Sequence, residues 1–268
     1  MIALTYNPDK AGALELFQRI LVWYESRGVK VLTKTEQLTG KEDFLMVLGG
    51  DGTILTSAKE QIQSKVPILG VNLGRLGFLT SLEEENLEAY LSLTLDKEAW
   101  TVEERLMLEV RVIQGGAEVY QDCALNDVVL SRNQLAGMLG FQLEVSGVKV
   151  DEFFADGFIV STPTGSTAYS LSAGGPILTP RMEAIVLTPI CAHTLYARPM
   201  VVDSAEEICI RLSLGSREDL LTLDGQHPLM ITGDTEIHIS RYREKARTVR
   251  FHDRPFFQVL GEKIGKRK

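Results

Sequence analysis

The residues best suited to chemistry form a short glycine-rich stretch, Gly49-Gly50-Asp51-Gly52-Thr53, which follows an apolar run ending at Leu48. Glycines at a strand-to-helix turn let bare backbone N–H groups approach an anion at the positive end of a helix. A carboxylate such as Asp51 is repelled by phosphates unless it ligates a metal ion or accepts a proton from an attacking hydroxyl. The stretch therefore predicts a phosphate loop for phosphoryl transfer, with a plain Gly-Asp-Gly turn as the alternative.

Two later segments also combine residue types that suit ligand binding. Asn126-Asp127 interrupts an apolar run and offers an amide and a carboxylate to ribose hydroxyls or a base edge, with an Asx turn as the alternative. The segment from Asp156 to Pro176 brings five closely spaced hydroxyl residues from a strand to a predicted helix N-terminus, and its Tyr169 could stack on a planar ring. A solvated Ser/Thr-rich loop would not require Ala168, Tyr169 and the paired glycines that follow.

Other polar residues give weaker signals. Asp224-Gly225 is typical of a hairpin turn, and the histidines near it and at His193 stand too isolated to be metal ligands. The cysteines Cys123, Cys191 and Cys209 lack metal-ligand spacing, so we expect small core residues. The sequence therefore names no metal ligands.

The elements around the glycine loop alternate between strands and helices. We expect strands at Ile2–Tyr6, Val29–Leu32, Phe44–Leu48 and Val66–Val71. We also expect one helix capped by Asp9, a second beginning near Thr53, and a third running from about Glu83 to Leu95. In the first helix the apolar residues Leu14, Phe17, Leu21 and Val22 fall at helical spacing, which indicates one apolar face. This alternation predicts a parallel α/β sheet, in which ligands bind at the carboxyl ends of strands, where Gly49 to Thr53 lies.

From Trp100 onward the apolar residues alternate with polar ones, so strands replace helices. We expect an α/β domain over residues 1–100 and a β-rich domain over residues 101–245. Residues 246–268 form a terminal segment that could return to the first domain.

The composition limits the classes of function. A chain of 268 residues with 44% hydrophobic and 24% charged residues is typical of a soluble globular protein, and no segment approaches the length of a membrane-spanning helix. The net charge of −8 argues against a nucleic-acid-binding surface. The stretch Met1–Pro8 has no basic region and reaches a turn too early for a signal peptide, so we expect a cytoplasmic protein.

Taken together, the glycine loop, Asn126-Asp127 and Asp156–Pro176 resemble the three signatures of the NAD kinase family. The resemblance includes Leu73–Leu79, and also Pro189–Leu195 with Arg198-Pro199. A Gly-Gly-Asp-Gly-Thr loop is also similar to loops of diacylglycerol-type lipid kinases and phosphofructokinases, so the long third signature is the specific one.

The resemblance implies transfer of a phosphoryl group from ATP, or from polyphosphate in some members, to the 2′-hydroxyl of the adenosine ribose of NAD, giving NADP. It implies a Rossmann-like α/β N-terminal domain, a mainly β C-terminal domain and NAD bound between them. It also implies a divalent metal ion such as Mg²⁺ and a homo-oligomer, either a dimer or a tetramer.

The resemblance also assigns roles to residues by position. Asp51 would activate or orient the 2′-hydroxyl, and phosphate oxygens would contact Gly49, Gly50, Gly52, Thr53 and Arg75, of which Arg75 varies in kind within the family. Besides Asp51 and Gly52, the residues expected to contact NAD are Phe78, Asn126, Asp127, Asp156, Ser166, Thr167, Ala168, Tyr169 and Gln226. Asp127 stands where many members have Glu.

Two other functions remain alternatives at this point. A lipid kinase would need an apolar groove for acyl chains, whereas Asp156 to Tyr169 supplies hydroxyls and an aromatic ring. A non-catalytic NAD-binding regulator would be expected to lack the acid of the glycine loop, and Asp51 is present.

Overall fold

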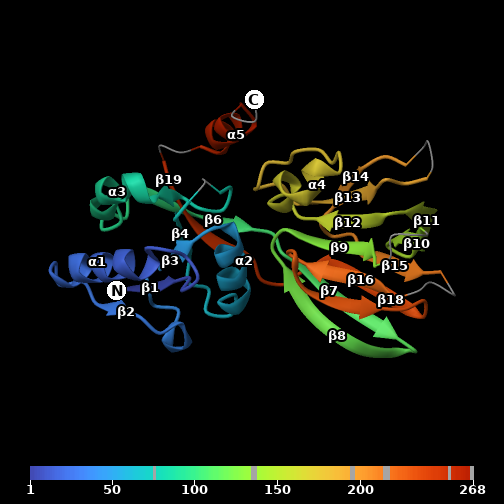
Figure 1. The fold of residues 1–268 in the computed structure, drawn as a ribbon, viewed down its shortest axis with the longest axis horizontal. Coiled ribbons are helices and arrows are strands. Elements are labelled where there is room, and N and C mark those ends of the chain that lie inside the picture. The colour runs from blue at the N-terminus through green and yellow to red at the C-terminus, as the bar shows by residue number, and fades with distance from the viewer. Residues whose placement is uncertain (75–76, 134–137, 194–196, 214–217, 253–254, 266–268) are drawn as a thin grey trace. The chain divides into compact units, whose positions relative to one another are not determined.

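The computed structural model describes residues 1–74, 77–133, 138–193, 197–213, 218–252 and 255–265 of the chain (Figure 1). The chain divides into two compact units. Unit 1 comprises Met1–Arg105 together with Ala246–Lys268, and unit 2 comprises Leu106–Lys245.

Unit 1 is built on a mixed sheet whose strand order is β2-β1-β3-β4-β19-β6, with β5 also paired to β4. Its strands are β1 (Ile2–Tyr6), β2 (Val31–Leu32), β3 (Leu45–Gly49), β4 (Ile68–Asn72), β5 (Leu82–Glu83), β6 (Trp100–Arg105) and β19 (Ala246–Phe251). The pairs among β1 to β4 are parallel, while β6 runs antiparallel to β19. The α/β character predicted for this part of the chain is confirmed.

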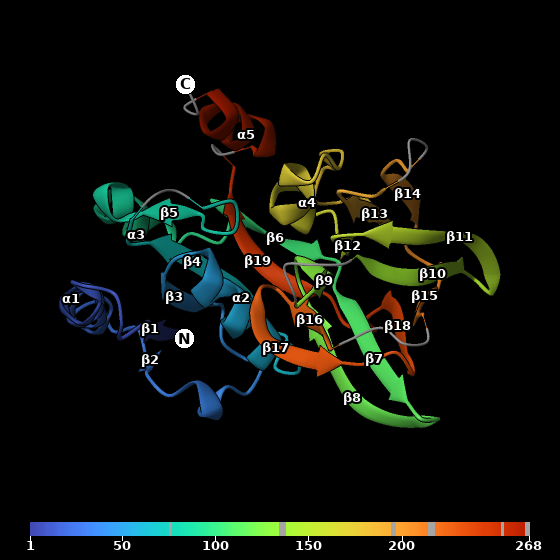
Figure 2. The same ribbon diagram turned by 45° about the vertical axis from the view of Figure 1, so that its right-hand side comes forward.

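Helices cover both faces of this sheet. The helical elements of unit 1 are α1 (Ala13–Glu25), η1 (Thr35–Gln37), α2 (Asp51–Glu60), η2 (Glu84–Asn86), α3 (Leu87–Leu93) and α5 (Phe256–Gly265). Side chains of α1 and α3 share one core with Met46, Leu48 and Val71 of the sheet. Ile54 of α2 lies against Gly70. Because successive residues of a strand face opposite sides of the sheet, Gly70 lies on the other face from its neighbour Val71. Figure 2 shows α1 and α2 on opposite sides of β3 and β4.

The first helix differs from the expectation in its start and in its buried face. Asp9 does not cap it, because Asp9 lies in a turn in which its N–H donates to Asn7 Oδ1, and α1 begins after Gly12, whose φ is 78°. Leu16, Ile20 and Tyr24 are buried in the core, and Phe17 and Leu21 are partly buried against it. Leu14 and Val22 are 52% and 64% exposed, so the expected apolar face was wrong for these two residues.

The end of the chain returns to unit 1. β19 lies between β4 and β6, pairing with β4 at Thr248 and with all of β6. Because β6 spans Trp100–Arg105, unit 1 extends beyond the boundary expected at residue 100.

Unit 2 consists of two antiparallel six-stranded sheets, ordered β11-β10-β15-β18-β7-β8 and β14-β13-β12-β9-β16-β17. The strands are β7 (Leu108–Gln114), β8 (Ala117–Ala124), β9 (Asp127–Arg132), β10 (Leu139–Val145), β11 (Val148–Ala155), β12 (Gly157–Ser161), β13 (Ala184–Ile190), β14 (Met200–Asp203), β15 (Ile208–Leu212), β16 (Asp219–Leu223), β17 (Gln226–Ile231) and β18 (Thr235–Arg241). Short helices η3 (Gly165–Thr167) and α4 (Tyr169–Ser172) follow β12. The mainly β character predicted here is confirmed.

One hydrophobic core joins the two sheets of unit 2, with inward side chains such as Phe141 and Ile237 from the first sheet and Phe158 and Leu221 from the second. A smaller cluster of Leu178, Ala184 and Val186 lies on the other face of β13. The second sheet is therefore covered on both faces at β13. This packing holds the segment after β12, which contains α4, against the sheet.

Within the described part of the chain, no helix is both long enough and apolar enough to cross a membrane.

Candidate functional site

The glycine loop is the turn between β3 and α2. β3 ends at Gly49, Gly50 is the N-cap, and α2 begins at Asp51, two residues before the expected start at Thr53. A Cβ at Gly49 would lie 2.4 Å from Thr53 Oγ1, so a side chain there would collide with the helix. A Cβ at Gly50 or Gly52 would meet no atom within 4 Å. These two residues thus present bare backbone beside a helix N-terminus, as an anion-binding loop requires.

Asp51 is held by a second loop of unit 1. Its Oδ2 accepts the N–H of Phe78 at 2.9 Å, and its Oδ1 accepts the N–H of Leu79 at 3.2 Å. A Cβ at Gly77 would lie 1.7 Å from Asp51 Oδ1, so only glycine allows this approach. A carboxylate has about four lone-pair directions, and therefore Asp51 keeps acceptor capacity for a further partner.

Three strand ends meet at the carboxyl edge of the sheet around this loop. Gly49 of β3 pairs with Asn72 of β4, and Asn7, just after β1, donates from Nδ2 to Thr53 Oγ1 at 3.2 Å. Asn72 is 3% exposed, and its buried amide nitrogen has no hydrogen-bond partner among the residues that the structure describes. Asn7 and Asn72 were not among the predicted site residues, although their places directly after β1 and at the end of β4 were a signal that could have identified them.

A pocket of about 500 Å³ opens at the end of β4. It is lined by Asn72, Leu73 and Gly74, by Arg19, and by the acidic side chains of Glu83, Glu84, Glu85 and Glu88. Four carboxylates disfavour phosphate groups, so the backbone of the glycine loop is the better phosphate-binding surface in unit 1. Arg75, the predicted phosphate contact between these features, lies outside the described residues.

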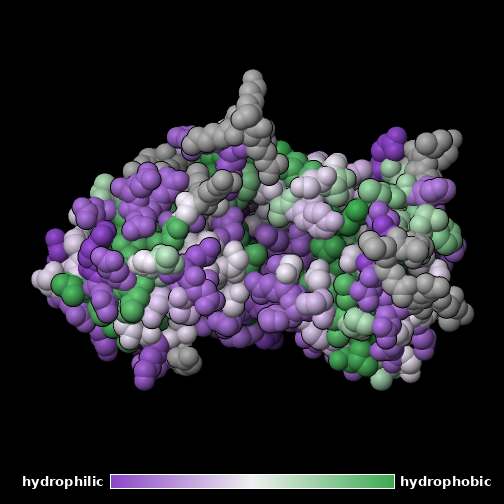
Figure 3. Space-filling view, in the orientation of Figure 1, coloured by the Kyte–Doolittle hydropathy of each residue, from purple (hydrophilic) through white to green (hydrophobic). Residues whose placement is uncertain are grey.

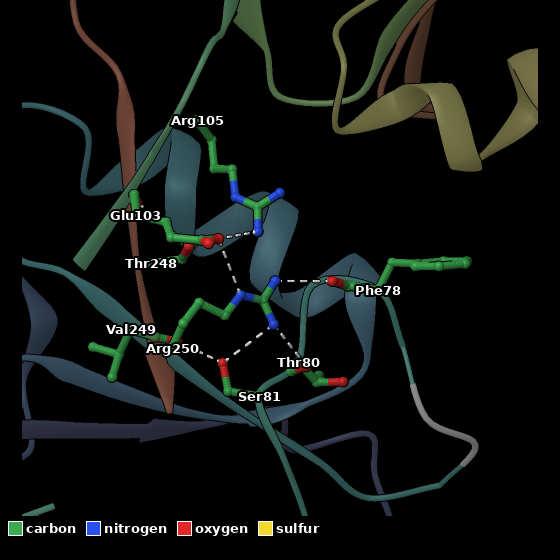
Figure 4. A network of polar contacts seen from close by, with 8 residues as sticks. All are labelled: Phe78, Thr80, Ser81, Glu103, Arg105, Thr248, Val249 and Arg250. Atoms are coloured by element: carbon green, nitrogen blue, oxygen red, sulfur yellow. Dashed lines mark hydrogen bonds and ion pairs between the residues drawn. The ribbon is translucent and has the colours of Figure 1, made fainter. Parts of the chain in front are cut away.

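Phe78 joins the loop that holds Asp51 to two basic residues from the end of the chain. Lys263 of α5 places Nζ 4.0 Å from the centroid of the Phe78 ring, a cation–π contact. Arg250 of β19 donates from Nη2 to Phe78 O at 2.9 Å (Figure 4). Arg250 was not among the predicted site residues, because nothing in the sequence around it indicates that its side chain reaches this loop.

Arg250 is poorly accessible, with 15% of its side chain exposed. Burial lowers the pKa of its guanidinium, whereas the nearby negative charges of Glu103 and Asp51 raise it. An arginine remains protonated at neutral pH, so Arg250 places a positive charge beneath the loop that holds Asp51.

In unit 2, Asn126 lies between β8 and β9, Asp127 begins β9, and a second acid, Asp224, holds this junction. Asp224 Oδ1 accepts the N–H groups of Asn126 and Asp127 at 2.6 and 3.1 Å, and Oδ2 accepts that of Leu125 at 2.9 Å. Three successive N–H groups around one carboxylate form a backbone nest. The Asx turn considered for Asn126-Asp127 is therefore replaced by an anchor from a distant segment, which sequence analysis missed.

Asp127 is a buried residue, 4% exposed. Burial, together with the negative charge of Asp224, raises its pKa from 3.8 to about 7. A carboxyl group that titrates near neutral pH can carry its proton and donate a hydrogen bond.

The hydroxyls of the segment after β12 mostly bind the segment itself. Thr162 Oγ1 donates to Leu125 O at 2.6 Å, Ser166 Oγ donates to Pro163 O at 2.6 Å, and Thr167 Oγ1 donates to Thr164 O at 3.2 Å. Ser166 also accepts the N–H of Leu178 at 3.0 Å and is completely buried. Ser166 and Thr167 therefore fix the backbone, which differs from the expected row of hydroxyls offered to a ligand.

Other predicted residues of this segment remain accessible. Tyr169, the first residue of α4, is 48% exposed, and Ala168 before it is partly exposed. Asp156 pairs with Arg132 at 3.0 Å between Oδ1 and Nε. Tyr169 is the side chain of this segment best placed to meet a ligand.

Gln226 begins β17, directly after the turn Asp224-Gly225. Both turn residues have positive φ, 54° and 68°, as the predicted Asp-Gly hairpin requires. Leu223 pairs with Gln226 across this turn, which confirms the hairpin.

The described residues contain one group of Cys, Glu and His side chains that could hold a metal ion. The ligand atoms of Cys209, Glu236 and His238 lie within 4.8 Å of one another. Glu236 already pairs with Arg211 at 2.9 Å, and Mg²⁺ prefers oxygen ligands to sulfur. This group does not fit Mg²⁺, whereas the carboxylate of Asp51 beside a phosphate loop does.

Comparisons with known proteins match both units. The family model described as the ATP-NAD kinase N-terminal domain matches residues 33–99, and that of the ATP-NAD kinase C-terminal domain matches residues 125–251. The NAD kinase of Moorella thermoacetica is 39% identical over 277 residues, which covers 98% of this chain and 88% of that protein. The NAD kinase of Geobacter sulfurreducens is 39% identical over 278 residues, which covers 98% of this chain and 96% of that protein.

Two solved structures are similar over the whole chain. An NAD kinase from Archaeoglobus fulgidus in complex with ATP has a TM-score of 0.76 and 30% identity, and the match covers 100% of both chains. Yeast NADH kinase complexed with NADH has a TM-score of 0.86 and 25% identity, covering 100% of this chain and 88% of that one.

Proposed function

The chain belongs to the NAD kinase family and is an enzyme that phosphorylates NAD to NADP, and we propose that Asp51 activates the acceptor hydroxyl in this reaction. The lipid-kinase and regulator alternatives are set aside, because the relatives that match nearly the whole chain are NAD kinases.

One observation carries the role of Asp51. Its carboxylate lies in the first turn of α2, next to bare glycine backbone, and the hydrogen bonds from Phe78 and Leu79 leave lone pairs for a substrate hydroxyl. In the proposed step, the 2′-oxygen of NAD forms a bond to the terminal phosphorus of ATP while the bond from that phosphorus to ADP breaks. The hydroxyl proton passes to Asp51. The backbone of Gly50 and Gly52 and the hydroxyl of Thr53 contact phosphate oxygens, whereas the N–H of Thr53 donates to Gly50 O at 3.0 Å within the turn.

The donor and the metal ion are part of the proposal. The ATP held by the Archaeoglobus fulgidus enzyme supports ATP as the donor, and polyphosphate remains the alternative. We propose that Mg²⁺ binds with the donor phosphates, because this ion commonly uses one or two carboxylates together with substrate phosphates. Asp51 is the carboxylate available to it in the glycine loop, and the ion would neutralise charge on the transferred phosphoryl group.

Residues of unit 2 are proposed to bind NAD. Asn126 and Asp127 supply an amide and a carboxyl group on an anchored backbone, and Tyr169 supplies an exposed ring for stacking on the adenine. Phe78, Ala168, Asp156 and Gln226 are further proposed contacts. For Ser166 and Thr167 the proposal is narrowed to their backbone, because their hydroxyls are engaged internally.

We propose that the protein works as a homo-oligomer. β11 is an edge strand of its sheet, and Val148 and Phe154 on it are 68% and 50% exposed. Figure 3 shows hydrophobic residues among hydrophilic ones on the visible surface of unit 2. Such side chains on an unpaired edge are typical of a surface covered by a second copy. Light scattering would report a dimer or tetramer, and a monomer at enzyme-assay concentrations would contradict the proposal. The cytoplasmic location stays a prediction from the sequence.

The decisive experiment for Asp51 is an assay with NAD, Mg²⁺ and either ATP or polyphosphate, in which NADP is measured. We expect Asp51→Asn to lower turnover about a hundredfold or more, the range for loss of a general base, with little change in the dissociation constant of NAD. Asp96→Asn is the matched control, because Asp96 is an exposed residue of unit 1 whose carboxylate accepts the N–H of Glu98. Near-normal turnover of Asp51→Asn would remove the proposed role.

A further inference from the structure

The loop that binds Asp51 is itself bound by one side chain, that of Arg250. Arg250 donates from Nη2 to Phe78 O at 2.9 Å and from Nη1 to Thr80 O at 3.3 Å. Figure 4 shows its guanidinium group beside both of these residues and Ser81. Phe78 and Leu79, whose N–H groups bind Asp51, lie within the span that Arg250 fixes.

A single peptide group connects the two interactions. The carbonyl of Phe78, which accepts from Arg250, and the N–H of Leu79, which donates to Asp51 Oδ1, belong to the same peptide unit. This unit is planar and rigid, so fixing its oxygen also fixes the direction of its N–H. A guanidinium at the carbonyl also polarises the peptide and strengthens the N–H as a donor.

Arg250 is in turn held on its other sides. Its Nε lies 3.6 Å from Glu103 Oε2, and Nη1 lies 3.4 Å from Ser81 Oγ. Glu103 is oriented by Arg105 at 2.7 Å, and Ser81 donates to Val249 O at 2.6 Å. β19, which carries Arg250, is an inner strand of the sheet. The guanidinium therefore has one well-defined position.

We propose that Arg250 is a positioning residue for the phosphoryl transfer, which fixes the orientation of the Asp51 carboxylate through the Phe78–Leu79 peptide; this inference rests on the proposed role of Asp51. Arg250 does not touch substrate in this scheme. Its contribution is to hold the carboxylate in the geometry in which a lone pair meets the acceptor hydroxyl.

The planar fork of arginine is essential to this role. Arg250 uses Nη2, Nη1 and Nε toward Phe78 O, Thr80 O and Glu103 at the same time. A lysine carries the same charge but presents it as a single point on a flexible stem. Arg250→Lys thus keeps the charge under the loop and loses the simultaneous contacts.

The test is a double-mutant cycle with Arg250→Lys and Asp51→Asn. We expect Arg250→Lys to lower kcat about tenfold to a hundredfold, as a misplacement of about 1 Å does, while the dissociation constant of NAD changes less than about threefold. In the Asp51→Asn background the same substitution should have almost no effect on residual turnover, because its effect passes through Asp51. Arg247→Lys is the matched control, since Arg247 also lies on β19 but donates to Lys65 O.

A second readout does not depend on activity. Hydrogen exchange of the peptide containing Phe78 and Leu79 should be faster in Arg250→Lys than in Arg247→Lys, because the loop loses its hydrogen bonds from Arg250. If Arg250→Lys does not fold, Glu103→Gln takes its place in both measurements, and we expect changes in the same direction and of smaller size.

The outcomes separate the two proposals. Unchanged kcat in Arg250→Lys, or an equal loss of turnover with and without Asp51, would overturn the positioning role of Arg250. Near-normal turnover of Asp51→Asn alone would overturn the role of Asp51 itself, whatever Arg250 does. A large loss in Arg250→Lys that disappears in the Asp51→Asn background supports both.

Discussion

The loops at Gly77–Leu79 in unit 1 and at Leu125–Asp127 in unit 2 are held by the same kind of interaction. Each wraps successive backbone N–H groups around a carboxylate from a distant part of the chain. Asp51 receives two such groups and Asp224 receives three. The two carboxylates differ in role. Asp51 keeps lone pairs that can accept a proton, whereas Asp224 serves as a structural anchor for its loop.

The surroundings of the two carboxylates also differ. Asp51 has a buried cation nearby, Arg250, which acts on the far side of its loop. Asp224 has instead a second acid nearby, Asp127, and the two negative charges together with burial push the proton onto Asp127. Burial and the negative charge of Asp224 favour a neutral carboxyl group at Asp127, whereas the charged group near Asp51 is the cation of Arg250.

The largest expected effect that separates the two loops is on stability. Asp224→Asn replaces a charged acceptor of three N–H groups by a neutral amide, so we expect the free energy of unfolding to fall by about 3 kcal/mol. Urea unfolding measures this loss. Asp203→Asn is the control, because Asp203 accepts the single exposed N–H of Ala205. Equal small losses in both variants would show that Asp224 is not an anchor.

An intermediate effect is expected on NAD binding through Tyr169. Tyr169→Ala should weaken binding by about 2 kcal/mol if the ring stacks on a base, with little change in stability because the ring is 48% exposed. Isothermal titration gives the dissociation constant. Tyr169→Phe keeps the ring and should bind normally, and an unchanged constant in Tyr169→Ala would remove this residue from the NAD site.

The last expected effect is a pH dependence of stability, which is smaller per pH unit than the two effects above. The pKa of Asp127 is raised from 3.8 to about 7 in the folded protein. Between these pH values the folded state keeps a proton that the unfolded state has lost, so the free energy of unfolding falls as the pH rises toward 7, by at most about 1.4 kcal/mol per pH unit. Asp127→Asn should flatten this decline between pH 5 and pH 7. Parallel stability curves for the two proteins would contradict the raised pKa.

Local patterns in the sequence predicted the elements that depend on local physics. β1 has the expected bounds Ile2–Tyr6, the glycine loop joins a strand to a helix, and Asp224-Gly225 makes the expected hairpin. In each case the chain carries its own signal, either an apolar run or residues that tolerate positive φ.

The features that the sequence did not predict depend on contacts between distant segments. A row of Ser and Thr residues shows donors and acceptors but not their partners, and in the structure Ser166 and Thr167 turn toward nearby carbonyls. The contacts of Asp224 with Asn126 and of Arg250 with Phe78 span 98 and 172 positions. No local periodicity contains such information.

The position of β19 has a consequence for synthesis of the protein. β6 pairs only with β19 among the strands of its sheet, and β19 is translated after the whole of unit 2. A nascent chain that ends before residue 246 therefore leaves Ile68 of β4 without its partner Thr248 and β6 without its neighbouring strand. Unit 2 is continuous in sequence and can fold first on the ribosome. The sheet next to Asp51 can therefore complete its strand pairing only when translation is nearly finished.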